Sequence, residues 1–252
     1  MVVSALPVLP PLQKLFVMGL PVHHSADYVG WLLKTLRTGH GGHVVTINAE
    51  MCVQAETNPK LNHIIQNATL IIPDGAGVQL YFQWVQHKRV RRYPGIEFSV
   101  DVLSQLTAAE PVVFYGGAPE LATAAAANWQ KKFPELNVAI AQHGYLSDAE
   151  QQAFQKDLEA LQPSVIFVGL GVPRQEMWIA KHRHLCPQAI WIGVGGSFDI
   201  WAGKKERAPR WMCNNNLEWL YRLYQEPWRW RRMLALPKFV WRSIGHDLGW
   251  HR

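Results

Sequence analysis

Short runs of apolar residues alternate with amphipathic segments along most of the chain. The apolar runs predict β-strands at 15–22, 43–47, 70–72, 112–115, 138–141, 165–168 and 189–194. The segments between them predict helices at 27–36, 49–68, 77–87, 96–109, 120–132, 148–161 and 174–184. Asn58-Pro59 should break the second helix, and Ser147 should cap the sixth. Because unbroken apolar strands separated by helices are typical of βαβ units, we predict an α/β fold with a doubly wound, mostly parallel, Rossmann-like sheet.

The alternation stops near residue 200, and this change predicts the domain organisation. Residues 1–13 are small, apolar and rich in proline, which indicates a loose N-terminal arm. Residues 14–199 carry the alternating pattern and should form the α/β core. Residues 200–252 are basic, aromatic and helix-like, and we expect a helical C-terminal appendage there.

Charge and tryptophan are concentrated in the predicted appendage. The formal net charge of the chain is +6, yet residues 200–252 carry 11 Lys and Arg against 4 Asp and Glu, together with seven of the 12 tryptophans. Basic charge interleaved with Trp suits an anionic membrane surface or a nucleic acid, and we favour the membrane surface. No run of about 18 apolar residues lacks charge, so no helix should cross a bilayer. The three cysteines have no metal-ligand spacing and fit a reducing compartment.

Glycines follow several of the predicted strands, where open parallel sheets bind their ligands. They are Gly116, Gly117, Gly144, Gly169, Gly171, Gly195 and Gly196. Glycine lets backbone N–H groups approach a phosphate closely, and the following helix N-terminus stabilises its charge. The alternative is that these glycines only make tight turns. As a group they favour a phosphate-bearing ligand.

Known phosphate-binding motifs are incomplete or missing. The sequence from Gly169 to Arg174 begins like a dinucleotide fingerprint, but Arg174 stands where a third Gly or Ala belongs. No P-loop sequence and no Asp-x-Asp pair occurs, and the histidines lack ligand spacing. We therefore expect no bound metal and disfavour a P-loop NTPase.

Asp74 is the acid that directly follows a predicted buried strand and precedes a glycine. Partial desolvation there would raise the pKa of the carboxyl and suit it to general base catalysis. Spacing alone supports equally well a role for Asp74 as the cap of the next helix. Thr46 and Asn48 end a neighbouring strand, where they could orient a substrate hydroxyl or serve only the turn.

Several linked motifs occur in a characteristic order between about residues 14 and 238. They are Thr46-Ile47-Asn48, Pro73-Asp74-Gly75-Ala76-Gly77-Val78, Gly169-Leu170-Gly171-Val172-Pro173-Arg174-Gln175-Glu176, Gly193-Val194-Gly195-Gly196-Ser197-Phe198-Asp199, Arg207-Ala208-Pro209, Leu217-Glu218-Trp219-Leu220-Tyr221-Arg222-Leu223 and Glu226-Pro227. The set resembles the WecG/TagA/CpsF family of bacterial glycosyltransferases.

The resemblance implies a metal-independent, inverting transfer from a UDP-sugar, typically UDP-N-acetylmannosamine or its uronic acid. The implied acceptor is N-acetylglucosamine on a polyprenyl (undecaprenyl) diphosphate carrier, at the cytoplasmic face of the cell membrane, for a cell-surface polysaccharide or teichoic-acid-like polymer. No cofactor is implied beyond the donor substrate.

By motif, the resemblance makes Asp74 the base that activates the acceptor hydroxyl and places Thr46 and Asn48 beside it. The glycines, Gln175 and Glu176 become donor-binding candidates. The appendage is implied to dock on the membrane and to bring arginines to the diphosphate, for which Arg207, Arg222, Arg229 and Arg232 are the candidates. The last three are spaced by 7 and 3 and would share one face of a continuous helix, although Pro227 interrupts it.

Two other function classes stay open from the residues alone. A nicotinamide-dependent Rossmann enzyme is disfavoured by the incomplete fingerprint. A non-catalytic, membrane-peripheral scaffold would keep the basic tail without needing Asp74. We expect no nucleic-acid partner, and homo-oligomer formation is left open.

Overall fold

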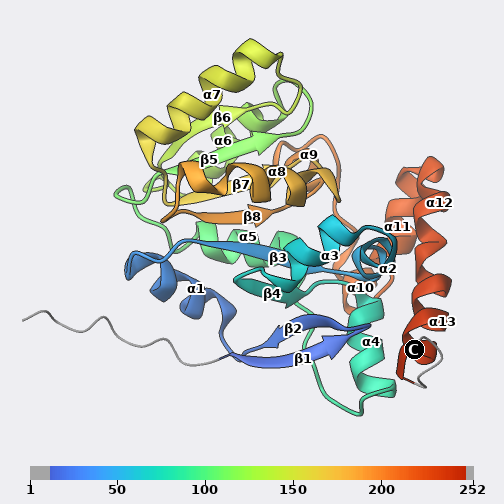
Figure 1. Ribbon diagram of the computed structural model, residues 1–252. Coiled ribbons are helices and arrows are strands. Elements are labelled where there is room, and N and C mark those ends of the chain that lie inside the picture. Colours follow the sequence, from blue (N-terminus) through green and yellow to red (C-terminus); the bar gives the residue numbers. More distant parts are fainter. Residues whose placement is uncertain (1–11, 248–252) are drawn as a thin grey trace, which may run out of the picture.

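A six-stranded parallel β-sheet with helices on both faces organises the computed structural model, which describes residues 12–247 (Figure 1). The strands of this sheet are β3 (Gly42–Ile47), β4 (Leu70–Pro73), β5 (Val112–Gly116), β6 (Val138–Gln142), β7 (Val165–Gly169) and β8 (Ile190–Gly193). Their order in the sheet is β4-β3-β8-β7-β5-β6, and every pairing is parallel. The predicted doubly wound α/β fold is therefore confirmed.

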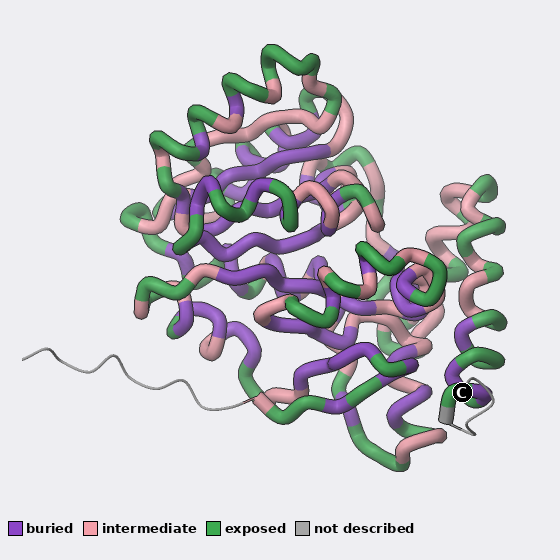
Figure 2. Tube along the Cα trace, in the orientation of Figure 1, coloured by how far each residue is buried: buried purple, intermediate pink, exposed green. Residues whose placement is uncertain are grey.

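Helices cover both faces of the sheet because its strands are apolar on both sides. The helices are α1 (Tyr28–Arg37), α2 (Ala49–Thr57), α3 (Pro59–Gln66), α4 (Ala76–Trp84), α5 (Gly95–Leu103), α6 (Leu121–Lys132), α7 (Asp148–Leu161), α8 (Arg174–His182) and α9 (Ser197–Trp201), with a 3₁₀ turn, η1 (Arg183–Leu185), after α8. Helices α1, α5, α6 and α9 share one apolar core with the sheet, while α2, α3, α4, α7 and α8 cover the other face. Figure 2 shows the resulting buried central strands.

The local signals for these helices work as the sequence predicts. Ser147 caps α7 by accepting from the Glu150 N–H, and the Glu150 carboxylate accepts from the Ser147 N–H, which completes a capping box. Asn58 caps α3, with Pro59 at its first position, so α2 and α3 are separate helices as expected.

The first predicted strand, 15–22, is wrong in one respect: it is a hairpin. Strand β1 (Gln13–Val17) pairs antiparallel with β2 (Leu20–His24) in a separate two-stranded sheet. The turn falls at Met18 and Gly19, both with positive φ. Residues 15–22, which include the turn, have no polar side chain, so no polar residue marks the reversal in the sequence.

The C-terminal region is helical and lies along one side of the core (Figure 1). It contains α10 (Arg210–Asn214), α11 (Glu218–Gln225), a 3₁₀ turn η2 (Pro227–Arg229), α12 (Trp230–Met233) and α13 (Ala235–Asp247). Phe239 of α13 is almost completely buried and packs against Tyr81 of α4, with ring centroids 6.2 Å apart.

The proposed division into arm, core and appendage stays a prediction. Residues 1–11 of the arm and 248–252 of the appendage lie outside the described residues. The boundary near residue 200 falls inside α9, whose Phe198 and Trp201 are buried in the core.

Candidate active site

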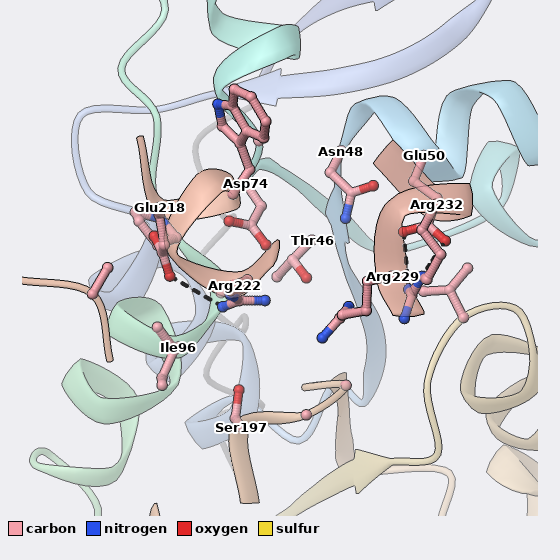
Figure 3. Close-up of a pocket in the computed structure, with 18 of the residues that line it drawn as sticks. Thr46, Asn48, Glu50, Asp74, Ile96, Ser197, Glu218, Arg222, Arg229 and Arg232 are labelled. Atoms are coloured by element: carbon pink, nitrogen blue, oxygen red, sulfur yellow. Dashed lines mark hydrogen bonds and ion pairs between the residues drawn. The ribbon is translucent and has the colours of Figure 1, made fainter. Parts of the chain in front are cut away.

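A cavity of about 420 Å³ opens at the carboxyl ends of the strands, between the core and the C-terminal helices (Figure 3). Strands β3, β4 and β8 supply its floor, and the C-terminal helices supply one wall. The residues that line it include Thr46, Asn48, Asp74, Arg92, Gly171, Gln175, Gly195, Gly196, Arg207, Glu218, Arg222, Arg229 and Arg232. Most of the residues predicted as a site are therefore in one place.

The register of β3 against β4 brings the polar residues together. Ile47 pairs with Pro73, so the residues that follow them, Asn48 and Asp74, leave the sheet side by side. The Asp74 N–H donates to the Ile47 carbonyl at 2.9 Å. A Cβ at Gly75 would lie 2.9 Å from the Asn48 Cβ, which explains why the turn after Asp74 needs glycine.

Asp74 contributes a partly buried carboxyl group to the lining of the pocket. Burial raises its pKa to about 6, against the lowering effect of the Arg92 and Arg222 charges and of a hydrogen bond from the Gly95 backbone. The N-cap of α4 is Gly75, and no side chain caps that helix. The structure thus does not support the interpretation of Asp74 as a helix cap, and it leaves the carboxylate directed into the cavity (Figure 3).

Asn48 and Thr46 lie beside Asp74 and are held by different contacts. The Asn48 side-chain oxygen caps α2 by accepting from the Met51 N–H at 3.0 Å. Its side-chain nitrogen therefore remains to face the cavity. Thr46 is the residue before last of β3, and its side chain would be 3.0 Å from a Cβ at Gly95. The turn chemistry expected for Asn48 and its place in the pocket are both present.

Gln175 is held by a buried relay of polar groups. Its Oε1 accepts from the Gly195 N–H at 2.9 Å, and its Nε2 donates to Glu176 Oε1 at 2.9 Å. Glu176 Oε2 in turn lies 2.6 Å from His43 Nε2. The relay links β3, α8 and the loop after β8, so it fixes the orientation of the Gln175 amide at the cavity.

One carboxylate in the lining of the cavity, Glu218, contacts three arginines. Arg92 Nη2 lies 2.6 Å from Glu218 Oε2, Arg222 Nη2 lies 3.1 Å from Oε1, and Arg207 Nε lies 3.7 Å from Oε1. Burial by itself raises the pKa of Glu218, but the charges of the three arginines outweigh it, so the pKa lies below its usual value. Arg92 also donates to the Asp74 carbonyl at 2.7 Å and ties this cluster to the end of β4.

The remaining cations are paired with other carboxylates. Arg232 makes a two-pronged contact with Glu50 of α2, at 2.8 and 2.9 Å. Lys205 and Arg229 share Glu226. The Nε atom of Arg229 is buried and has no hydrogen-bond partner among the described residues, which is unusual for a donor of a charged group. An anionic ligand in the cavity would supply the missing acceptor.

Pro227 interrupts the helix that carries these arginines. Arg222 lies on α11, Arg229 ends η2, and Arg232 lies on α12. They reach the same cavity from three separate elements rather than along one face of a continuous helix.

Five predicted donor-binding residues lie outside the lining of this cavity: Gly116, Gly117, Gly144, Gly169 and Glu176. Packing explains several of the glycines. A Cβ at Gly116 would lie 2.5 Å from the Gly169 backbone, one at Gly144 would lie 2.5 Å from Leu170, and one at Gly169 would lie 2.5 Å from Phe198. Glu176 is buried and reaches the site only through Gln175.

Sequence reasoning missed Arg92 and the part that Glu218 plays. Arg92 lies in the segment between α4 and α5, which has no periodic pattern, and only the fold brings it to Asp74. Glu218 belongs to the motif that contains Arg222, and an acid four residues before an arginine on a helix is a signal for an ion pair.

Comparison with known proteins decides the class. The sequence profile of the "Glycosyl transferase WecG/TagA/CpsF family" matches residues 15–252. The chain belongs to this family. Its membership favours the glycosyltransferase hypothesis over the nicotinamide enzyme and the non-catalytic scaffold.

Similar proteins within the family share one name, N-acetylglucosaminyldiphosphoundecaprenol N-acetyl-beta-D-mannosaminyltransferase. The protein of that name from Bacillus spizizenii is 36% identical over 208 residues, 82% of this chain and 80% of the relative. Those from Bacillus subtilis and Staphylococcus aureus are each 34% identical over 79% of this chain and 78% of the relative.

Two further observations concern metal ligands and membrane-spanning helices in this chain. Among residues 12–247, no group of three or more His, Cys, Asp or Glu side chains is arranged to hold a metal ion. None of the helices in the described part of the chain has both the length and the apolar character needed to cross a bilayer. Metal independence stays a prediction.

Proposed function

We propose that the protein transfers N-acetylmannosamine from its UDP derivative to N-acetylglucosaminyl-diphospho-undecaprenol, with inversion and without a metal ion. The observation that carries the proposal is the meeting of Asp74, a carboxyl with its pKa raised to about 6, with a group of arginines in one cavity. The relatives' name supplies the sugar and the acceptor.

In the proposed reaction Asp74 accepts the proton of the acceptor hydroxyl. The hydroxyl oxygen forms the new bond to the anomeric carbon of the donor, from the face opposite the leaving group. The bond between that carbon and the β-phosphate oxygen breaks, and UDP leaves with the electron pair. A displacement on a UDP-α-sugar inverts the anomeric carbon, in agreement with the β product in the relatives' name.

The departing diphosphate requires positive charge or N–H donors, because no metal ligand set is visible among the described residues. Arginine suits this role, since its planar fork of donors matches phosphate oxygens. Arg229 has a buried Nε that finds no hydrogen-bond partner within residues 12–247, and Arg207, Arg222 and Arg232 line the same cavity. Gly171, Gly195 and Gly196 bring backbone close to the same space.

Thr46, Asn48 and Gln175 are proposed to orient the sugars. The free side-chain nitrogen of Asn48 and the Thr46 hydroxyl lie beside Asp74, where the acceptor hydroxyl must sit. Gln175 lies on the opposite side of β3, next to the glycine loop that would hold the donor.

A lipid-linked acceptor requires a membrane contact, and the C-terminal helices are proposed to make it at the cytoplasmic face. Trp228, Trp230 and Trp241 are 70%, 54% and 66% exposed, and the Arg231 guanidinium lies over the Trp230 ring at 5.6 Å. Amphipathic rings and basic groups are favoured at an anionic headgroup layer.

A transfer assay with purified protein tests the proposal. UDP-N-acetylmannosamine, UDP-N-acetylglucosamine and UDP-N-acetylmannosaminuronic acid are compared as donors to a short-prenyl analogue of the diphosphate-linked acceptor. We expect product only with the first donor and a rise in melting temperature with UDP but not with NAD. Transfer of the uronic acid alone would contradict the donor assignment, and stabilisation by NAD alone would contradict the class of ligand.

A further inference from the structure

Phe16 and Trp84 are two of the exposed aromatic side chains of the core, and neither lines the catalytic cavity. Phe16 of β1 is 51% exposed and Trp84 at the end of α4 is 68% exposed. Lys14 shares the exposed face of β1 with Phe16, because residues two apart in a strand point to the same side. We call Lys14, Phe16, Trp84, Lys88 and Arg89 the hairpin–α4 patch.

Direct contacts join the elements of this patch to one another and to α13. Gln86 Nε2 donates to the Phe16 carbonyl at 2.8 Å and to the Tyr81 hydroxyl at 2.9 Å. Tyr81 packs on Phe239 of α13, and a Cβ at Gly19 would lie 3.5 Å from His246 near the end of α13. The patch therefore adjoins the helix that carries exposed Trp241 (Figures 1 and 2).

The charge of the patch has one sign. Between Asp74 and Glu97 the chain has no acidic residue but carries Lys88, Arg89, Arg91 and Arg92. Lys88 and Arg89 are exposed, and neither they nor Lys14 forms an ion pair with any residue from 12 to 247. This differs from the catalytic cavity, where the arginines are paired with carboxylates.

We propose that the hairpin–α4 patch is a second membrane contact, on the core itself, which binds an anionic lipid surface. Exposed Trp and Phe are favoured at the headgroup boundary, and unpaired basic groups attract an anionic leaflet. The proposal rests on the proposed function only in taking a membrane as the site of the acceptor. The segment between Asp74 and Glu97 has four basic residues and no acidic one, which favours a lipid surface over a second copy of this chain, whose facing patch would carry the same positive charge.

A second membrane contact would fix the orientation of the core relative to the membrane. Contact through the C-terminal helices alone would leave the core free to pivot on the membrane. Contact on both sides of α13 would set the cavity at a fixed angle and height above the lipid headgroups.

Binding of the full chain to phosphatidylcholine vesicles, with and without phosphatidylglycerol, tests the proposal. The variant Lys88→Gln/Arg89→Gln should bind phosphatidylglycerol vesicles more weakly by about fivefold per charge, the equivalent of roughly 1 kcal/mol for each basic group near an anionic leaflet. Trp84→Ser should weaken binding in addition, and added salt should narrow the difference between wild type and the charge variant.

Matched controls lie on the far edge of the core. Lys131→Gln/Lys156→Gln removes two exposed charges of α6 and α7, and Tyr145→Ser removes an aromatic side chain that is 71% exposed. Both controls should bind vesicles like the wild type. Unchanged vesicle binding by the patch variants, or no binding by the wild type, would overturn the proposal. A shift from dimer to monomer in Trp84→Ser, with vesicle binding intact, would overturn it in favour of a contact between copies.

The same variants separate this surface from the proposed activity. With the short-prenyl acceptor in solution, the patch variants should transfer sugar at the wild-type rate, because none of the changed residues lines the cavity. If the wild type binds vesicles through the patch yet transfers no sugar, the proposed function fails while the surface stands.

Discussion

His43 Nε2 and Glu176 Oε2 lie 2.6 Å apart in a region where both side chains are almost fully buried. Glu176 uses its other oxygen to accept from Gln175, whose own oxygen holds the Gly195 N–H. The pair is therefore connected to the catalytic cavity by hydrogen bonds, although neither residue lines it.

Glu176→Gln should loosen the Gln175 amide and raise the KM for the donor by about tenfold, with little change in the KM for the acceptor. The variant should also lose roughly 1–3 kcal/mol of unfolding free energy, because a buried polar contact of His43 is weakened. Steady-state kinetics and denaturant titrations measure the two effects.

Tyr115→Phe is the matched control for this prediction. It removes a partly buried hydrogen bond to Gln151, 3.1 Å long, on a strand that does not reach the cavity. It should lower stability and leave both KM values unchanged. An equal rise of the two KM values in Glu176→Gln would contradict a specific link to the donor.

The pH dependence of catalysis should follow Asp74. With a carboxyl pKa of about 6, kcat/KM should rise with pH up to about 6 and level off above it, because the base must be ionised. Asp74→Asn should lower turnover by about 10²–10⁴-fold and abolish this dependence. A purified Asp74→Asn protein with near wild-type turnover would remove Asp74 from the mechanism.

The pKa of Asp74 should also affect the free energy of unfolding, which should fall with rising pH where kcat/KM rises. Because the folded state raises the pKa of Asp74, it binds the proton more tightly than the unfolded chain does, so stability falls as pH rises from about 4 to about 6. Asp74→Asn escapes this loss. Its melting temperature relative to the wild type should therefore increase across that window, and a constant difference would argue against the raised pKa.

Glu218→Gln should release three arginines at once. We expect a loss of about 3 kcal/mol in unfolding free energy at neutral pH, since breaking a buried pair leaves charge uncompensated. The lowered pKa of Glu218 means that this contribution is present above its unfolded pKa and is lost as pH falls through its folded pKa. Glu159→Gln, an exposed change on α7, is the control and should be neutral.

Transfer should survive excess EDTA. The arginines and backbone N–H groups of the cavity are expected to replace a metal at the diphosphate. Activity that disappears in EDTA and returns with Mg²⁺ or Mn²⁺ would reveal a ligand set that the sequence and the described residues do not show.

The sheet could be predicted because burial on both faces requires unbroken apolar strands. The position of the site at the carboxyl ends of the strands could be predicted because the strands are parallel. The β1–β2 hairpin could not be predicted, because its turn places Met18 at positive φ within a continuous apolar run. A methionine gives no local signal for that conformation.

The acid of the site was easier to predict than its cations. Asp74 directly follows a strand, so its position depends on local sequence alone. Arg92 depends on the path of a long irregular segment and on a carboxylate 126 residues further along the chain. The glycines could not be assigned from the sequence either. Gly116 and Gly169 pack against one another, and a glycine at a strand end gives the same sequence signal whether it faces a phosphate or a neighbouring strand.

The Glu50–Arg232 contact joins an early helix of the chain to one of the last. On a ribosome, the strands that carry Thr46 and Asp74 emerge long before the arginines that complete the cavity. Roughly 160 residues separate Asp74 from Arg232, which takes roughly 8–30 seconds to synthesise at 5–20 residues per second. Strand β8 lies between β3 and β7 and completes the sheet roughly 40 residues before Arg232. A nascent chain can thus complete its sheet while it still lacks the cationic wall, and the cavity is complete only after Arg232 has been made.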